Sequence, residues 1–292
     1  MTLLVDSDGH RNEELLEFIV GRWKMLLAGA LTGTILGLAV WALSTPIYRA
    51  EIILAPAMDD TGGMLGSLMA DYGALANLAG INVSAPQDGR QESLAVLRSR
   101  ALAEAFIKEQ ELMKVFFAED WDKSSGRWMD PDPDEHPSMW DAFELFDEDI
   151  RSVSEDRRTG MITLSMEWSD PELAAGWANS FVARANEQIR QRTIQEASRT
   201  IDYLRKELAK SDLVEVRQAI SKIIEGQVKT VAIARVREQY AFRVVDQAVP
   251  ADRDRPVRPS LVLTAAVGLL VGLAVTAIAV MLRHRAGVRR AV

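Results

Sequence analysis

Residues 170–209, DPELAAGWANSFVARANEQIRQRTIQEASRTIDYLRKELA, decide the fold of this chain. Asp170 is a residue type that favours the N-cap of a helix. Pro171 suits the first helical position, because the N–H that proline lacks has no partner there anyway. After these two residues only Gly176 disfavours a helix. The stretch therefore predicts one continuous helix over 171–209, about 58 Å long at 1.5 Å per residue.

The C-terminal part of this helix carries an apolar stripe on strict a/d spacing, which is the pattern of a coiled-coil seam. A helix of this length is longer than a compact domain of this size can cover on all sides. The seam therefore needs a partner, which is the following helix folded back, neighbouring subunits, or both. The seam residues are Ile194, Ala197, Ile201, Leu204 and Leu208.

A second helix is expected over 212–238. Asp212 and Glu215 are three residues apart and resemble a capping box at its start. An apolar stripe then continues at helical spacing, which suits packing against another helix. The stripe consists of Leu213, Val216, Ile220, Ile224, Val228 and Val231.

Strand patterns lie on both sides of the two helices, which predicts an α+β fold. Residues 47–55 contain a short apolar run that Pro56 ends. Residues 150–153 and 161–168 bracket the turn sequence DRRTG and predict a hairpin with one buried face. Residues 240–249 read as a final strand. A short extended connector follows, with prolines at Pro250, Pro256 and Pro259.

Three further stretches precede the hairpin. Residues 91–117 predict one or two helices. Residues 59–89 show the spacing of an amphipathic helix interrupted by glycines, and a loop packed over the domain fits them as well. The acidic stretch 119–136 is expected to be a loop, with Trp121 and Trp128 pinning it to the core.

Two segments are long and apolar enough to cross a bilayer, which takes about 20 residues. Residues 25–43 are nineteen residues without a charge, and residues 261–282 are twenty-two. The first segment can alternatively be read as a cleaved signal peptide. However, the 24 residues ahead of it are net negative, whereas a signal peptide has a short basic start.

Basic residues beside the two segments predict that both chain ends are cytoplasmic. Residues 1–24 and 283–292 are then cytoplasmic tails, and residues 44–260 form one domain outside the cytoplasm. Outside the two tails the chain has 27 basic and 37 acidic side chains, a balance that does not suit nucleic acid. The basic residues that set this orientation are Arg22, Lys24, Arg283, Arg285, Arg289 and Arg290.

Both apolar segments contain glycines spaced by four. Small residues at this spacing let helix backbones approach closely in lipid, so they predict specific helix packing, either within or between subunits. These glycines are Gly29, Gly33 and Gly37 in the first segment, and Gly268 and Gly272 in the second.

No motif for catalysis or for cofactor binding occurs in the sequence. The three histidines do not cluster, there is no cysteine, and neither a phosphate loop nor a nucleophile elbow is present. The acidic run at 130–135 lacks the glycine and terminal glutamate of a calcium loop. We therefore expect no enzymatic activity, no cofactor and no metal.

Several short motifs follow one another along the chain and together resemble a known family. They are Trp23-Lys24, Pro46-Ile-Tyr-Arg-Ala50, Leu54-Ala-Pro56, Thr159-Gly-Met-Ile-Thr-Leu164, Asp170-Pro-Glu-Leu-Ala-Ala-Gly-Trp-Ala-Asn179 and Phe242-Arg-Val-Val-Asp-Gln-Ala248. In this order, and followed by the proline-rich approach to the second segment, they resemble the Wzz-type polysaccharide co-polymerases. These are the chain-length determinant proteins of bacterial O-antigen and related surface polysaccharides. The ten-residue tail resembles the subtype without a cytoplasmic kinase domain.

The resemblance implies a two-pass protein of the bacterial inner membrane with a periplasmic α/β domain. The sheet of that domain would include the strands nearest the two spans, a long helix would reach away from the membrane, and the subunits would form a ring-like homo-oligomer. The implied role is non-catalytic: a scaffold for the membrane-embedded polymerase that sets the length of lipopolysaccharide O-antigen or a related polysaccharide. The lipid-linked glycan is a further candidate partner.

Two other classes of protein fit parts of the sequence. One is an adaptor of a capsule or exopolysaccharide export complex that works with a separate tyrosine kinase. The other is a sensor with two spans around an exterior helical domain. A sensor needs a cytoplasmic output module, for which the ten-residue tail has no room.

Overall fold

A computed structural model describes residues 23–57 and 86–290. The chain divides into two compact units: an α/β unit over Tyr48–Arg253, and a helix pair formed by the segments up to Ile47 and from Asp254 onward. Helices and strands are mixed as the sequence predicts, which confirms the α+β class. Residues 1–22 of the predicted tail, including Arg22, and most of the predicted helix at 59–89 lie outside the described residues.

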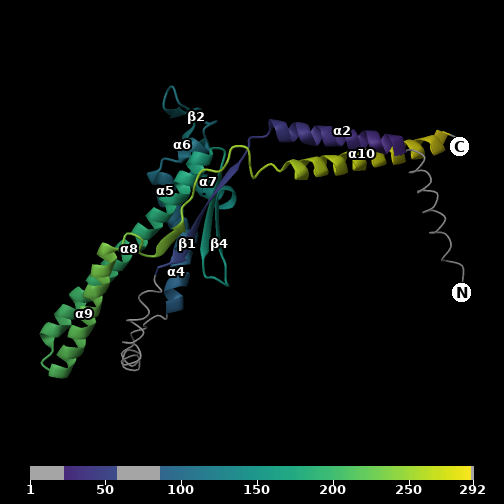
Figure 1. Ribbon diagram of the computed structural model, residues 1–292. Coiled ribbons are helices and arrows are strands. Elements are labelled where there is room, and N and C mark those ends of the chain that lie inside the picture. Colours follow the sequence, from purple (N-terminus) through teal and green to yellow (C-terminus); the bar gives the residue numbers. More distant parts are fainter. Residues whose placement is uncertain (1–22, 58–85, 291–292) are drawn as a thin grey trace, which may run out of the picture. The chain divides into compact units, whose positions relative to one another are not determined.

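The sheet of the α/β unit has four antiparallel strands in the order β4-β5-β1-β6 (Figure 1). In β1, Tyr48 pairs with Trp168 of β5 at one end of the strand. At the other end, Pro56 pairs with Phe242 of β6. The strands nearest the two apolar segments are therefore neighbours in one sheet, as the resemblance implied. The strands are β1 (Tyr48–Pro56), β4 (Arg151–Glu155), β5 (Ile162–Trp168) and β6 (Phe242–Asp246).

Strands β4 and β5 form the predicted hairpin, but the expectation of a single buried face on it is wrong. On β5, Ser165 and Glu167 are buried along with the alternate apolar residues. The reason is that β5 is an interior strand, and Arg49 of the neighbouring β1 reaches across to Glu167, with 2.7 Å between Nε and Oε1. The charge on Glu167 is thus paired where the sequence pattern suggested an open face.

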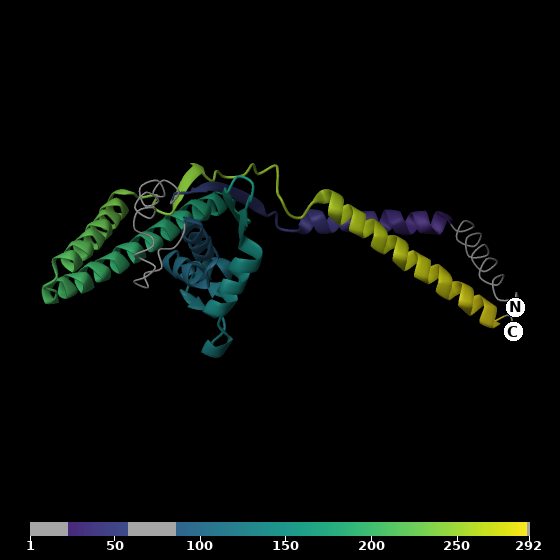
Figure 2. The same ribbon diagram turned by 90° about the horizontal axis from the view of Figure 1, so that it is seen from below.

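Helix α8 (Pro171–Lys210) runs for 40 residues, and the side chain of Asp170 caps it by accepting a hydrogen bond from the N–H of Glu172 at 2.9 Å. The N-terminal half of α8 packs on β1 and β5. The C-terminal half pairs with α9 (Val214–Val236) in a helical hairpin (Figure 2). The residues of α8 buried in the N-terminal half are Pro171, Ala174, Ala175, Trp177, Ala178, Phe181, Val182, Ala185 and Asn186.

The start and the stripe of α9 differ from the prediction. Leu213 occupies the N-cap position without a side-chain hydrogen bond, so the capping box of Asp212 and Glu215 does not form. Val228 is 47% exposed. Gln227 lies on the covered side of α9 instead of Val228. Residues separated alternately by four and three positions stay on the side of a helix that faces its partner. That side includes Ile220, Ile224, Gln227, Val231 and Ala234.

Short helices complete the core of the α/β unit, where the rings of Phe106, Phe146 and Phe181 lie 5.2–6.0 Å apart. Phe146 begins a π-helical turn, η3 (Phe146–Ile150). The helices are α4 (Pro86–Arg98), α5 (Arg100–Glu109), α6 (Met113–Phe116) and α7 (Met139–Leu145).

The stretch 119–136, predicted to be a loop, contains a two-stranded ribbon of β2 (Trp121–Asp122) and β3 (Arg127–Trp128), followed by a 3-10 turn, η2 (Pro133–Glu135). The rings of Trp121 and Trp128 pack edge to face on each other, with centroids 5.0 Å apart. Neither ring belongs to the buried core, so the expectation that they pin this stretch to the core is wrong.

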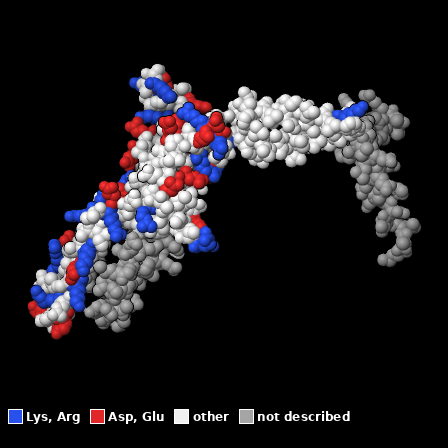
Figure 3. Space-filling model, in the orientation of Figure 1, with Lys and Arg blue, Asp and Glu red and all other residues white. Residues whose placement is uncertain are grey.

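Helices α2 (Trp23–Leu43) and α10 (Leu261–Arg290) make up the helix pair and pack against each other (Figure 1). By length and composition each of the two can cross a membrane. Residues 25–43 and 261–282 have no charged side chain, and the pair is white there in Figure 3, whereas both signs of charge are interspersed on the α/β unit. Helix α10 continues through Arg290, so most of the predicted 283–292 tail is helical.

Candidate functional site

Acidic side chains were the one group for which the sequence raised a possible cation site. No group of three or more His, Cys, Asp or Glu side chains within 23–57 and 86–290 is placed to hold a metal. In the acidic run, Asp130 and Asp132 accept hydrogen bonds from backbone N–H groups two residues further on, at 2.8 and 3.0 Å. The candidate functional features among the described residues are contact surfaces and the side chains that hold them.

The first such surface is the contact between α2 and α10, which the predicted glycines form within one chain. A methyl group on Gly33 would lie 2.8 Å from Cα of Gly272, and one on Gly37 would lie 2.5 Å from the carbonyl oxygen of Thr264. A methyl group on Gly268 would lie 3.0 Å from Cα of Gly37. These distances are shorter than van der Waals contact, so the two backbones touch at a spacing that only glycine permits.

Two threonines, which the sequence analysis did not single out, extend this contact. Gly29 faces the side chain of Thr276, as Gly37 faces the backbone of Thr264. Both threonine hydroxyls bond to carbonyls of their own helix, Thr276 to Gly272 at 2.8 Å and Thr264 to Ser260 at 3.0 Å. The spacing of four along α10 at 264, 268, 272 and 276 was the signal that could have identified them.

The second surface is the hairpin of α8 and α9. In the part of α8 that pairs with α9, Ala197 and Ile201 are buried, while Ile194, Leu204 and Leu208 are half-buried. A partner for the seam is thus present within the chain. Other apolar residues of the hairpin stay exposed, and these are Tyr203, Leu213, Val214, Val216, Ile223, Val228 and Val236.

The connector after β6 contains Pro250, Pro256 and Pro259. Residues at and just before the start of β1 hold it by hydrogen bonds at two points. Within the α/β unit, the hydroxyl of Tyr48 donates to the carbonyl of Arg253 at 3.1 Å. Within the helix-pair unit, the N–H of Ile47 donates to the carbonyl of Arg258 at 2.9 Å. The chain segments that lead into and out of the α/β unit are therefore joined to each other twice.

Two asparagines on α8 bind the backbone of the β6 segment, a role that the sequence pattern did not predict for either of them. The Oδ1 of Asn186 accepts from the N–H groups of Ala241 and Phe242, each at 2.8 Å, and its Nδ2 donates to the carbonyl of Phe242 at 3.0 Å. Asn179 binds both backbone groups of Ala248 in the same way, at 3.2 and 2.8 Å. The two asparagines are seven residues apart, about two helical turns, on the packed face of α8. Amides on an apolar face were the signal in the sequence.

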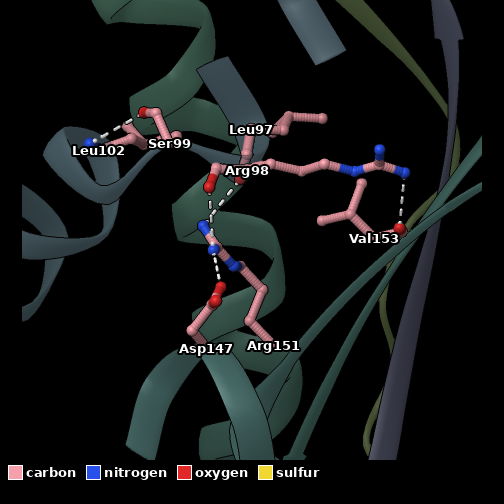
Figure 4. Close-up of polar contacts among 7 residues, drawn as sticks. All are labelled: Leu97, Arg98, Ser99, Leu102, Asp147, Arg151 and Val153. Atoms are coloured by element: carbon pink, nitrogen blue, oxygen red, sulfur yellow. Dashed lines mark hydrogen bonds and ion pairs between the residues drawn. The ribbon is translucent and has the colours of Figure 1, made fainter. Parts of the chain in front are cut away.

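Arg151 joins α4 to the sheet (Figure 4). Its guanidinium donates to the last carbonyls of α4, from Nη1 to Leu97 at 2.8 Å and from Nη2 to Arg98 at 3.2 Å, and it forms an ion pair with Asp147. Burial lowers the pKa of Arg151, and the hydrogen bond and charge of Asp147 oppose that shift. Helix C-termini carry partial negative charge, so a buried cation is well placed here. This is a structural contact that fixes the α4–α5 corner.

No family model and no curated protein matches the chain. Among solved structures, the chain is similar to a full-length bacterial polysaccharide co-polymerase, at 11% identity over 98% of each chain and with a TM-score of 0.40. It is also similar to a fragment of WzzB, a polysaccharide co-polymerase from Salmonella Typhimurium. That similarity has 12% identity over 72% of this chain and 100% of the fragment, with a TM-score of 0.33. Both structures belong to the class of protein that the sequence motifs resemble.

Proposed function

We propose that this chain is a non-catalytic polysaccharide co-polymerase. It crosses the inner membrane twice with both ends in the cytoplasm and the α/β unit in the periplasm. It regulates the chain length of lipopolysaccharide O-antigen or a related surface polysaccharide, as an oligomeric scaffold for the membrane-embedded polymerase.

The proposal rests on where α8 begins and ends within the α/β unit. Tyr48 pairs with Trp168 and bonds to Arg253, so α8 starts, at Pro171, near the place where the chain passes into and out of the unit. Asn186 is already at the far end of the sheet, where Phe242 pairs with Pro56. Another 24 residues of α8 follow, which is about 36 Å of rod beyond the sheet. A protein tethered at one end and extended at the other suits a spacer or scaffold.

Homo-oligomer formation is supported by the apolar side chains that the hairpin leaves exposed. Tyr203 on α8 is 63% and Val214 on α9 is 62% exposed in the single chain. Several exposed apolar side chains on one hairpin suit an interaction site, and copies of one chain joined side by side would cover them. An assembled ring would then present many rods around one polymerase.

The experiment that tests the proposal is a glycan ladder from a strain lacking the gene. We expect the polymer to be made still, but with a broadened or shifted length distribution that the wild-type gene restores. An unchanged ladder would rule out length control. If polymer accumulated inside the cell at normal length, the export adaptor would be the better description, because an adaptor acts after synthesis.

A further inference from the structure

We propose that Trp140 and Arg100 form a binding platform for a neutral sugar ring of the polysaccharide, an inference that rests on the proposed function. Trp140 is the only exposed tryptophan of the α/β unit, all five of whose tryptophans lie in described residues, and it is 55% exposed. Burial in the core therefore does not account for its position.

The backbone that carries Trp140 is fixed by the start of α7. Ser138 and Asp141 form a capping box around it: the N–H of Asp141 donates to Oγ of Ser138 at 3.3 Å, and the carboxylate of Asp141 accepts from the N–H of Ser138 at 2.8 Å. Trp140 lies between these two residues in the first turn. The ring itself contacts Arg100 and Phe143, and a backbone that is already ordered loses little conformational entropy when a ligand binds.

Arg100 covers one side of the indole. Its guanidinium carbon lies 4.2 Å from the centroid of the Trp140 ring and 5.3 Å from that of Phe143. Its Nε is paired with Oε1 of Glu104 at 2.5 Å, and within the described chain this is the polar contact that Arg100 makes. The two Nη groups therefore keep donors for a ligand. Arg100 thus covers part of the indole, and 55% of Trp140 stays exposed beside this contact.

The chemistry of this platform fits a pyranose. One face of such a ring presents C–H groups, which the negative face of an indole attracts, and its rim presents hydroxyls. Arg100 supplies charged donors for those hydroxyls, and the carboxylate of Glu104 supplies an acceptor. Glu144 lies four residues after Trp140, on the same face of α7. The two carboxylates disfavour an anionic sugar and an anionic lipid surface alike, so we assign the platform to a neutral sugar residue.

The test is saturation-transfer NMR on the full chain in lipid nanodiscs, which avoids detergents with sugar headgroups. The probes are the delipidated surface polysaccharide of the same bacterium, a neutral dextran oligosaccharide and an anionic polygalacturonate oligosaccharide. We expect transfer from the wild-type protein to ring protons of the first probe, and about tenfold weaker affinity in Trp140→Ala. Trp140→Phe should retain part of the binding. Met129→Ala removes a similarly exposed large apolar side chain from the same α/β unit and should bind like the wild type.

Three results would overturn the platform: equal binding by Trp140→Ala and wild type, no transfer to the bacterium's own polysaccharide, or transfer to polygalacturonate only. A changed oligomer size in Trp140→Ala with unchanged sugar binding would assign the residue to a protein contact instead. The gene deletion keeps the two proposals distinguishable. If the deletion alters the ladder but the protein binds no sugar, only the platform is contradicted. If sugar binding depends on Trp140 but the deletion leaves the ladder unchanged, only the proposed function is contradicted.

Discussion

The side-chain amide of Asn186 binds both backbone groups of Phe242, and it does so at the outer edge of the sheet. The N–H of Ala57 donates to the carbonyl of Ala241, so these two residues form a hydrogen-bonded pair of the antiparallel ladder. The next pair, Pro56 and Phe242, is therefore a non-hydrogen-bonded pair, in which the N–H and C=O of Phe242 point away from β1. Asn186 forms hydrogen bonds with those groups, as a neighbouring strand would. The side chain of Gln239 meets the N–H of Val244 in the same way, at 3.1 Å. Side chains thus close part of an edge that would otherwise be open to another strand.

Asn186→Ala should lower the free energy of unfolding of the α/β unit by about 2–4 kcal/mol, because it leaves buried backbone donors and an acceptor of β6 without partners. Urea denaturation followed by tryptophan fluorescence measures this change. Gln239→Ala is the control, since it removes a single, exposed contact of the same strand. Equal stability of the two variants would show that Asn186 is not needed to hold β6.

Arg151→Met should destabilise the unit by about 1–3 kcal/mol, because it keeps much of the side-chain volume but leaves the carbonyls of Leu97 and Arg98 without their donor. Arg98→Met is the matched control. It removes one exposed hydrogen bond, from Arg98 to the carbonyl of Val153. The measurement is the urea midpoint together with hydrogen exchange in α4. Faster exchange in the control than in Arg151→Met would contradict the role given to Arg151.

Gly33→Leu and Gly268→Leu should separate α2 from α10, because neither site has room for a side chain. We expect both variants to alter the glycan ladder while the circular dichroism and urea midpoint of the α/β unit stay unchanged. Ala39→Leu makes the same kind of change at an exposed position of α2 and should keep the wild-type ladder. Wild-type ladders from both glycine variants would remove the proposed role of this contact in length control.

Val214→Glu and Val228→Glu should shift the protein toward smaller assemblies, because each puts a charge into apolar surface that the single chain leaves exposed. Native mass spectrometry from nanodiscs reads out the subunit number. Ser221→Glu adds the same charge at an exposed polar position of α9 and should leave the assembly intact. If all three variants assemble alike, the exposed face of the hairpin is not a subunit contact.

Features set by neighbouring residues could be read from the sequence. The capped start of the long helix at Asp170, the two apolar segments and the β4–β5 hairpin all depend on patterns within a few tens of residues. The glycines of α2 and α10 could be identified for the same reason, since their spacing of four is local to each helix. The spacing did not identify the helix against which these glycines pack. In the structure Gly33 packs against Gly272 of the same chain.

Contacts between distant residues were decided only by the tertiary structure. Whether Gln227 or Val228 faces α8 depends on the rotation of one helix against another, which the apolar pattern of α9 leaves ambiguous. Trp121 and Trp128 look like core residues in a linear pattern, yet in a short ribbon they pack edge to face on each other. Asn186 is an amide on an apolar helix face, but the sequence does not say what it binds, because its partner is a strand edge that lies beside it only in the folded chain. Local propensity is encoded residue by residue, whereas the pairing of polar groups across the chain exists only after the chain has folded.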